Sequence, residues 1–319
     1  MKIGILTSHG EPAADQRFCE AATKRGHEAV LIDLMQCSLL LSQDANVHIY
    51  YHGRPLPDDI AAIIPRIDIP HTEFGSSVMR QFEALHFPTT DSVAAIEHGR
   101  DKLQCMQRLS EYAIPMPATG FAYTREDLKK IIGTVGDYPI IMKLIEGTEG
   151  NGVFRVHSLD EAYDIFDRHN TQGMRLIVQE YISESAGTDI RSFVIDGKIV
   201  ASMRRQSQNG DFRANVSLGA HSFPVDLTTE EAKMVLAATN AIDIQIAGVD
   251  FVRSNRGPLL LEINTSPGFT GEQGLESVTS VDVAGLMIDF AVHCAMRQTQ
   301  PSLITTTQAP LMRGLTLSQ

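Results

Sequence analysis

Residues 247–264 read Ala-Gly-Val-Asp-Phe-Val-Arg-Ser-Asn-Arg-Gly-Pro-Leu-Leu-Leu-Glu-Ile-Asn. Two apolar runs flank a polar turn that contains glycine, which is the pattern of an antiparallel β-hairpin. If the turn is symmetric about Arg256, Asp250 lies directly opposite Glu262 on the other strand. Asn264 then shares the strand face of Glu262, because side chains two residues apart point the same way.

Two opposed carboxylates among apolar strand residues repel each other and are costly to bury. A hard divalent cation would remove that cost, and two carboxylates with an amide carbonyl are ligands that suit Mg²⁺ or Mn²⁺. The hairpin therefore predicts a metal site formed by Asp250, Glu262 and Asn264. An alternative stays open, in which both carboxylates lie on a solvated face and pair with Arg253 or Arg256.

A second feature is the glycine-rich stretch Met-Lys-Leu-Ile-Glu-Gly-Thr-Glu-Gly-Asn-Gly at residues 142–152. Glycines let a backbone approach phosphates closely. The stretch joins two predicted strands and lacks a Gly-Lys-Ser/Thr ending, so we expect a flap and not a P-loop. Lys143, alone among apolar neighbours, would need an anion such as a nucleotide phosphate. The alternative is a plain hairpin whose lysine reaches solvent.

A third feature is the strand end at residues 177–182, Ile-Val-Gln-Glu-Tyr-Ile. An apolar strand stops at the polar residues Gln179 and Glu180. Backbone groups at such a strand end can meet an adenine edge while the carboxylate holds a ribose hydroxyl. A strand end wetted by solvent explains the same pattern, so both interpretations stay open.

A fourth feature is the hairpin predicted by the Asp-Gly turn at residues 196–197. Symmetric pairing about this turn places Asp189 opposite Arg204, with Arg191 on the same face as Asp189. Arg213 follows downstream. Several arginines beside a predicted phosphate site suit stabilisation of transferring phosphoryl oxygens. The alternative is a surface ladder of ion pairs with little energetic value.

The remaining predicted elements divide the chain. Up to about residue 95, strands alternate with helices, which is typical of a parallel sheet with helices on its faces. One long helix is predicted over residues 92–112, followed by a proline break at 114–117. Beyond residue 139, strand pairs with tight turns indicate antiparallel sheets interleaved with helices, an α+β organisation. After about residue 297, a run of Gln, Thr, Ser and Pro predicts a disordered tail.

The composition excludes several classes of function. The 319 residues suggest about two domains, and 27 Lys and Arg against 39 Asp and Glu give a net charge of −12, which argues against general nucleic-acid binding. No apolar stretch is long enough for a membrane span, and the first residues predict a strand and not a signal peptide. The four cysteines are scattered, which favours a reducing cytoplasm over disulfides or a zinc site. A dinucleotide fingerprint and the GxSxG, HExxH and CxxC motifs are absent from the sequence.

Taken in order, these features resemble the ATP-grasp superfamily, and most closely its branch of RimK-type α-L-glutamate ligases, which modify a small-subunit ribosomal protein. The resemblance covers residues 1 to about 290. The segments that carry it include Met-Lys-Ile-Gly-Ile-Leu-Thr-Ser-His-Gly at 1–10, Arg-Asp-Lys-Leu at 100–103, the stretch at 142–153, Val-Gln-Glu-Tyr-Ile at 178–182, Thr-Asp-Ile-Arg at 188–191, Gly-Asp-Phe-Arg-Ala-Asn at 210–215 and Leu-Glu-Ile-Asn-Thr-Ser-Pro-Gly at 261–268.

The resemblance implies a role for particular residues. Asp250, Glu262 and Asn264 are implied as ligands of Mg²⁺ or Mn²⁺, with two ions expected. Arg213 and Arg204 are implied to stabilise the charge that develops on the transferring group. The ATP-binding residues that it implies are Lys102, Lys143, Gly147, Gly150, Gly152, Gln179, Glu180, Tyr181, Ile182, Asp189, Arg213, Ala214 and Asn215.

The resemblance also implies an architecture and a reaction. A Rossmann-like pre-ATP-grasp α/β domain is expected at 1–95, a central ATP-grasp lobe with a glycine-rich lid at 96–178, a C-terminal lobe with the metal site at 179–297 and a tail at 298–319. The implied reaction is ATP- and Mg-dependent addition of L-glutamate to the C-terminus of a protein or peptide through an acylphosphate. The resemblance also implies a cytoplasmic protein that forms a homo-oligomer, with a tetramer as the expected state. The alternatives are another amino acid, a small-molecule carboxylate acceptor, or a nucleotide-binding regulatory protein without catalysis.

Three segments depart from the family's usual pattern. They read Asp-Ile-Pro-His-Thr-Glu at 68–73, Val-Ser-Leu-Gly-Ala at 216–220 and Phe-Thr-Gly-Glu-Gln at 269–273. We expect these segments to line the acceptor side of the site. They therefore bear on which amino acid and which acceptor are joined, and not on the chemistry of ATP.

Overall fold

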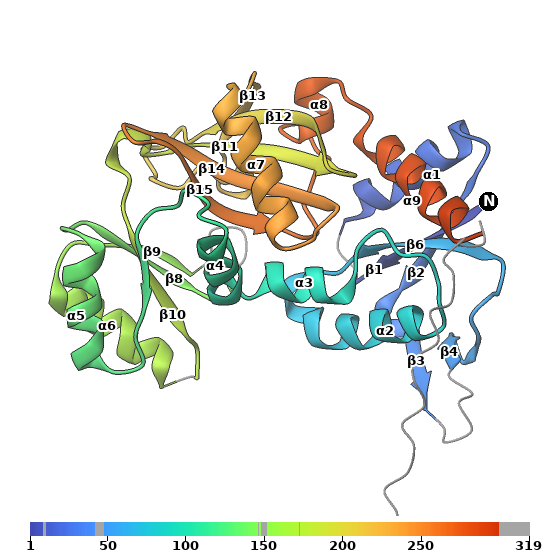
Figure 1. Ribbon diagram of the computed structural model, residues 1–319, viewed down its shortest axis with the longest axis horizontal. Helices are drawn as coiled ribbons and strands as arrows, with labels where there is room; N and C mark the ends of the chain where they lie inside the picture. The colour runs from blue at the N-terminus through green and yellow to red at the C-terminus, as the bar shows by residue number, and fades with distance from the viewer. Residues whose placement is uncertain (9–10, 42–47, 146, 148–151, 172, 300–319) are drawn as a thin grey trace, which may run out of the picture.

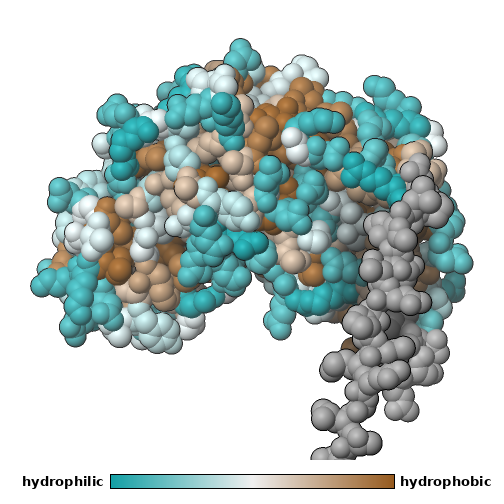
Figure 2. Space-filling model, viewed as in Figure 1, coloured by the Kyte–Doolittle hydropathy of each residue, from teal (hydrophilic) through white to brown (hydrophobic). Residues whose placement is uncertain are grey.

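The computed structural model describes residues 1–8, 11–41, 48–145, 147, 152–171 and 173–299. The strands and helices form three regions (Figure 1): an N-terminal region at the right, a central lobe at the lower left and a C-terminal lobe above them. In the space-filling view, hydrophilic residues predominate on this face, and an indentation separates the central lobe from the N-terminal region (Figure 2). Among the described residues, no helix combines the length and the apolar character that a membrane crossing would require.

The N-terminal region is built on a parallel sheet, as the alternating pattern predicts. Its strand order is β2-β1-β6, and the strands span Glu28–Asp33, Lys2–Thr7 and Ile60–Arg66. Helix α1 (Pro12–Lys24) and the last helix, α9 (Val283–Thr299), pack on one face, and α2 (Thr72–Ala84) packs on the other. A small antiparallel sheet of β3 (Cys37–Leu40), β4 (His48–Tyr51) and β5 (Arg54–Pro55) was not predicted.

The long helix predicted over residues 92–112 is wrong, because the structure has two helices there. Helix α3 (Val93–Arg100) and helix α4 (Lys102–Glu111) are separated by Asp101, whose backbone is extended with φ −81° and ψ 106°. The carboxylate of Asp101 accepts hydrogen bonds from the backbone N–H groups of Leu103 and Gln104 at 2.9 and 3.0 Å. An aspartate in this role caps the start of a helix. The break therefore places Lys102 in the first turn of α4.

The central lobe holds an antiparallel sheet in the order β7-β10-β8-β9, with strands Thr119–Phe121, Leu176–Glu180, Ile140–Leu144 and Val153–Val156. Helices α5 (Arg125–Val135) and α6 (Leu159–Asn170) pack against this sheet. The predicted lobe boundary at residue 178 falls inside β10, whose pairing with β8 continues to Glu180.

The C-terminal lobe holds a second antiparallel sheet in the order β13-β12-β11-β14-β15, with strands His221–Pro224, Lys198–Gln206, Thr188–Ile195, Ile246–Ser254 and Gly257–Asn264. Helix α7 (Thr229–Ala241) packs on one face. Helices α8 (Leu275–Thr279) and α9 lie on the other face, and α9 thereby joins this lobe to the N-terminal sheet in one hydrophobic core. The predicted antiparallel, α+β character of this half is confirmed.

The two hairpins of this sheet differ in how well their register was predicted. In the β14–β15 pair, Asp250 faces Glu262 as predicted. In the β11–β12 pair, the predicted partner of Asp189 is wrong, because Asp189 faces Arg205 and not Arg204. A bulge between Phe193 and Val194 shifts the pairing by one residue. Because a one-residue shift reverses the face of every side chain, Arg204 points away from Asp189.

Candidate active site

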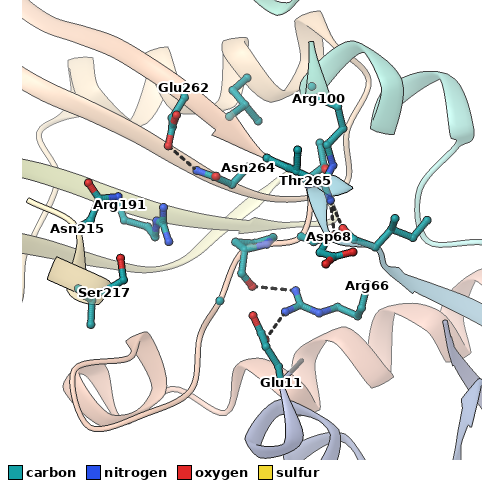
Figure 3. A pocket seen from close by; sticks show the side chains of 18 of the residues that line it. Glu11, Arg66, Asp68, Arg100, Arg191, Asn215, Ser217, Glu262, Asn264 and Thr265 are labelled. Carbon is teal, nitrogen blue, oxygen red and sulfur yellow. Dashed lines mark hydrogen bonds and ion pairs between the residues drawn. The ribbon is translucent and has the colours of Figure 1, made fainter. Parts of the chain in front are cut away.

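Two cavities meet at the β14–β15 hairpin. The small cavity has a volume of about 120 Å³ and the large cavity about 500 Å³. Both are lined by Val153, Arg205, Asn215 and Glu262. The large cavity, seen in Figure 3, draws its lining from the N-terminal region as well as the C-terminal lobe. A ligand in one cavity can therefore contact a ligand in the other at Asn215 and Glu262.

The small cavity gathers most of the residues predicted to bind a nucleotide. Its apolar walls come from Ile141, Val153, Ile182, Val252 and Leu261. The predicted residues that line it are Lys143, Gln179, Glu180, Tyr181, Ile182, Asp189, Arg213, Ala214 and Asn215. Gly150 lies outside the described residues, whereas Lys102 and Gly147 line the large cavity. A cavity with apolar walls and several charged lining residues suits an adenine base with attached phosphates.

Lys143 is a partly buried lysine that lines this cavity. Burial lowers the pKa of its ammonium, while Glu262 and Asp250 act in the opposite direction. In the part of the chain that the structure describes, no carboxylate lies within ion-pair distance of Lys143. A buried cation without a paired anion is costly. Lys143 is therefore suited to bind an anionic ligand such as a phosphate.

Lys102 and two glycines fix the edges of the glycine-rich stretch. The ammonium of Lys102 donates to the carbonyl oxygens of Gly147 and Ile145 at 2.8 and 3.2 Å. Gly152 has φ +78°, and a Cβ there would lie 2.5 Å from Leu144 Cδ1. Only glycine fits such a position without strain. The lysine at the start of α4 thus meets the beginning of the stretch, and Gly152 forms its end.

The strand end at Gln179 and Glu180 is already engaged within the protein. Gln179 is buried, and its Nε2 donates to Thr119 Oγ1 at 2.9 Å. Both carboxylate oxygens of Glu180 accept from Arg256 Nη2, at 2.7 and 2.8 Å. A ribose hydroxyl that donates a hydrogen bond to Glu180 would therefore bind a carboxylate whose orientation is fixed by Arg256. The arginine of the β14–β15 turn thus pairs with Glu180 and not with either predicted metal ligand.

Arg213 belongs to a cluster of charges and rings at the mouth of the small cavity. Its guanidinium donates to both carboxylate oxygens of Asp211, the shortest contact being 2.8 Å. The guanidinium also lies 5.7 Å from the centre of the Phe212 ring, and Arg155 lies 5.2 Å from the same ring. Two cations on one aromatic ring create a positive region beside the cavity.

Asp250 belongs to a largely buried network of four charged side chains. Arg191 donates to both carboxylate oxygens of Asp250 at 2.8 and 2.6 Å. Arg205 donates to both oxygens of Asp189 at 2.7 and 2.6 Å and to Asp250 Oδ2 at 3.0 Å. Burial alone would raise the pKa of Asp250, but the two arginines outweigh it and lower that pKa to about 2. Asp250 therefore stays ionised at any physiological pH.

The predicted metal ligands lie together and retain oxygen donors for a cation. Asn264 Nδ2 is 3.2 Å from Asp250 Oδ2 and 3.5 Å from Glu262 Oε1. Glu262 has no cation within ion-pair distance among the described residues, and Asp250 Oδ1 accepts only one hydrogen bond there. In the described part of the chain, no three or more His, Cys, Asp and Glu side chains are placed to hold a metal ion together. A hard cation here would therefore depend on two carboxylates, an amide oxygen and ligand oxygens, a set that fits Mg²⁺.

Arg204 does not reach either cavity. Its guanidinium lies over the ring of Phe223, 5.4 Å from the centroid, and its side chain is exposed. The prediction that Arg204 acts in the reaction is therefore not supported by its position. Its neighbour Arg205 occupies the inward place instead, because of the bulge in β11.

The large cavity contains functional candidates that the motifs did not predict. Ser8, Glu11, Arg66, Asp68, Arg100 and Ser266 line it, and several of them come together in Figure 3 from distant parts of the chain. The only sequence signal was indirect: all three departing segments contribute to this lining, through Asp68, Ile69, Val216, Ser217, Thr270 and Gln273. The three segments thus contribute to one cavity, and its assignment to the acceptor side stays a prediction.

Comparison with known protein families agrees with this geometry. The RimK PreATP-grasp domain family matches residues 1–96, and the RimK-like ATP-grasp domain family matches residues 99–291. A protein of Aliivibrio fischeri (strain MJ11), named probable alpha-L-glutamate ligase, is 43% identical over 291 residues, which cover 91% of this chain and 95% of that protein. A protein of Aeromonas salmonicida (strain A449) with the same name is 39% identical over 303 residues, covering 95% of this chain and all of that one.

Solved structures share the fold at lower sequence identity. The ATP-grasp ligase PsnB complexed with a minimal precursor has a TM-score of 0.70 and 20% identity, over 92% of this chain and 99% of that one. A complex of PsnB with the precursor, Mg and ADP has a TM-score of 0.69 and 19% identity, over 93% and 98%. The family matches, the named relatives and the shared fold all indicate an ATP-grasp ligase, and two cavities that meet at an acidic hairpin are consistent with one. The chain belongs to the RimK-like family of ATP-grasp proteins and is an ATP-dependent ligase.

Proposed function

We propose that this ligase uses ATP and Mg²⁺ to join L-glutamate to the C-terminal carboxyl group of a protein or peptide. The relatives named probable alpha-L-glutamate ligase support glutamate as the amino acid, and PsnB, solved with a precursor peptide, supports a peptide as the acceptor. A ribosomal protein as the acceptor, a homotetramer, two metal ions and a cytoplasmic location remain predictions.

The observation that carries the proposal is the shared wall of the two cavities. A nucleotide in the small cavity directs its phosphates toward Lys143, Asn215 and Glu262, and the last two also face the large cavity. A carboxylate in the large cavity can then approach the terminal phosphate. Holding the reactants in this way supplies much of the rate enhancement in phosphoryl transfer.

The proposed reaction has two steps. An oxygen of the acceptor carboxylate attacks the γ-phosphorus of ATP, and the bond from that phosphorus to the bridging β-phosphate oxygen breaks. The products of this step are an acylphosphate and ADP. The amine of L-glutamate then attacks the acyl carbon, the carbon–oxygen bond to phosphate breaks, and inorganic phosphate and a proton are released. Lys143 and Lys102 hold phosphates, and Arg213 is the proposed cation for the developing charge.

Asp250, Glu262 and Asn264 are the proposed metal ligands. A bound Mg²⁺ would neutralise phosphate charge during transfer. Glu262 lines both cavities, Asn264 lines the large cavity, and Asp250 lines the small cavity and is kept ionised. Glu180, Tyr181 and the apolar walls are proposed to hold the adenosine.

Glu262→Gln is the decisive variant for this proposal. Asp250→Asn would also remove the anion from two buried arginines, so a loss of activity there would mix folding with chemistry. Phosphate release from ATP and Mg²⁺ should require L-glutamate and a peptide that ends in glutamate, and the peptide should gain glutamyl mass. Glu262→Gln should abolish release with an unchanged melting temperature, while exposed Glu126→Gln should retain it.

The twenty amino acids tested singly distinguish the alternatives. Release with a different amino acid would keep the mechanism and replace the substrate, an outcome favoured by the departing segments around Asp68, Val216 and Thr270 in the large cavity. ATP binding without release under any combination would support the regulatory alternative. Full activity in a folded Glu262→Gln protein would contradict the metal assignment.

A further inference from the structure

Arg100 is a partly buried arginine in the wall of the large cavity. It ends α3, and its Nη2 donates to the backbone carbonyl of Ile67 and, at 3.0 Å, to Ser266 Oγ. Its Nε is buried and has no hydrogen-bond partner. Among the described residues, no carboxylate lies within ion-pair distance of its guanidinium.

The other arginines of this cavity are paired. Arg66 binds Glu11 at 2.8 Å, Arg191 binds Asp250, and Arg205 binds Asp189 and Asp250. Arg100 is the exception within the described lining of the cavity, although a buried guanidinium N–H group without a partner, such as its Nε, is costly to maintain.

Asp68, the carboxylate whose charge acts on Arg100, does not pair with it. Asp68 lines the same cavity, and its Oδ1 is bound by Ser8 Oγ at 2.5 Å and His71 Nδ1 at 2.6 Å. Burial and the charge of Arg66 lower the pKa of Arg100 to about 10, against the smaller opposite effect of Asp68. At neutral pH the guanidinium is still charged, so the wall presents an unmatched positive charge to any ligand.

We propose that Arg100, oriented by Ser266, binds the α-carboxylate of the incoming amino acid. This inference rests on the proposed function and assigns one end of its substrate. A carboxylate that attacks ATP must lie at the junction of the cavities, near Asn215 and Glu262. In Figure 3, Arg100 lies across the large cavity from Asn215. It is therefore placed for a carboxylate that does not react, and every α-amino acid brings one.

Charge-assisted hydrogen bonds to a planar guanidinium give the expected size of the effect. Such bonds contribute about 1.5–3 kcal/mol, which corresponds to roughly 10- to 100-fold in affinity. Arg100→Gln should therefore raise the KM for L-glutamate by about that factor. The affinity for ATP, measured by calorimetry, should stay within about twofold, because Arg100 does not line the small cavity.

Comparing L-glutamate with 4-aminobutyrate, which lacks the α-carboxylate, makes the test specific. Calorimetry with Mg²⁺ and a non-hydrolysable ATP analogue measures binding of both ligands without turnover. The wild-type protein should prefer L-glutamate, and Arg100→Gln should lose that preference. Arg80→Gln, an exposed arginine that pairs with Glu97, should behave as the wild type does.

Three results would overturn the assignment. They are an unchanged preference in Arg100→Gln, an equal loss of nucleotide affinity, and a raised KM for the peptide acceptor alone. If a different amino acid supports turnover, glutamate is not the substrate, and the same comparison of that amino acid with its decarboxylated amine tests the role of Arg100. If the wild-type protein binds none of the twenty amino acids, both proposals are wrong. If the wild-type protein is active and Arg100→Gln behaves as the wild type does, only the inference about Arg100 is wrong.

Discussion

Exchanging two neighbouring arginines tests the charge network and the register of the β11–β12 hairpin together. Arg205 is 3% exposed and forms three hydrogen bonds with Asp189 and Asp250, which are 12% and 2% exposed. Arg204 is exposed and packs on the ring of Phe223. Arg205→Met removes the cation from two buried carboxylates, whereas Arg204→Met removes a single cation–π contact.

The structure gives a different magnitude for each variant. Removing one partner of a buried ion pair costs about 3–5 kcal/mol, because an uncompensated charge remains. Asp189 retains no other side-chain hydrogen bond among those of the described residues, so the cost for Arg205→Met should lie in that range. An exposed cation–π contact contributes about 0.5–1 kcal/mol. Arg205→Met should therefore be the less stable variant by about 2–4 kcal/mol.

Urea unfolding followed by far-ultraviolet circular dichroism measures the difference, since the chain has no tryptophan to report it. A double-mutant cycle with Asp189→Asn adds a second criterion, because the double variant Arg205→Met/Asp189→Asn should recover part of the loss. The reasoning is refuted if Arg204→Met is the more costly variant, if the two costs are equal, or if Arg205→Met and Asp189→Asn are additive. The first of these results would support the register predicted from the sequence, in which Asp189 pairs with Arg204.

Three further predictions concern single residues. Gly152→Ala should lower the melting temperature more than Gly26→Ala, because both glycines have positive φ but only at Gly152 would a Cβ meet Leu144 at 2.5 Å. Lys143→Met should weaken ATP binding about tenfold or more in calorimetry without loss of thermal stability, because it removes a partly buried cation that has no carboxylate partner among the described residues. The ion pairs of Asp250 should stabilise the fold fully above the unfolded-state carboxyl pKa of about 4 and lose that effect as the pH falls to about 2. Acid titration by circular dichroism should accordingly show a shallower loss of stability between those pH values in Asp250→Asn than in the wild type.

The two hairpins show how far a register can be read from a sequence. The β14–β15 pairing of Asp250 with Glu262 was predicted from a turn centred on Arg256. In the structure the turn is tighter, with Ser254 paired to Gly257, and a bulge next to Asp250 restores the predicted pair. The same kind of bulge in β11 shifts Asp189 from its predicted partner. Turn residues determine the start of a register, but a bulge depends on packing between strands and leaves no local signal.

The alternation of strands and helices predicted the parallel sheet and the antiparallel half, because periodicity reflects which face is buried. The break at Asp101 was missed, since an aspartate inside a helical pattern gives no sign of whether it will cap a new helix. The lining of the large cavity could not be predicted from the sequence for a different reason. Arg66, Arg100 and Ser266 meet only through tertiary packing of three regions, and none of them belongs to a local motif that names a ligand.

The arginines around Asp250 have opposite effects on the proposed metal site. Arg191 and Arg205 keep the carboxylate ionised, so protons do not compete for it at neutral pH. Their two positive charges also repel a divalent cation at the distances of a buried network. In the proposed site, the phosphates of ATP would carry the negative charge that offsets this repulsion, and Lys143 would bind them in the same place. We therefore expect the site to hold a cation together with the nucleotide and to bind the cation weakly alone, which would couple assembly of the charged site to the binding of ATP.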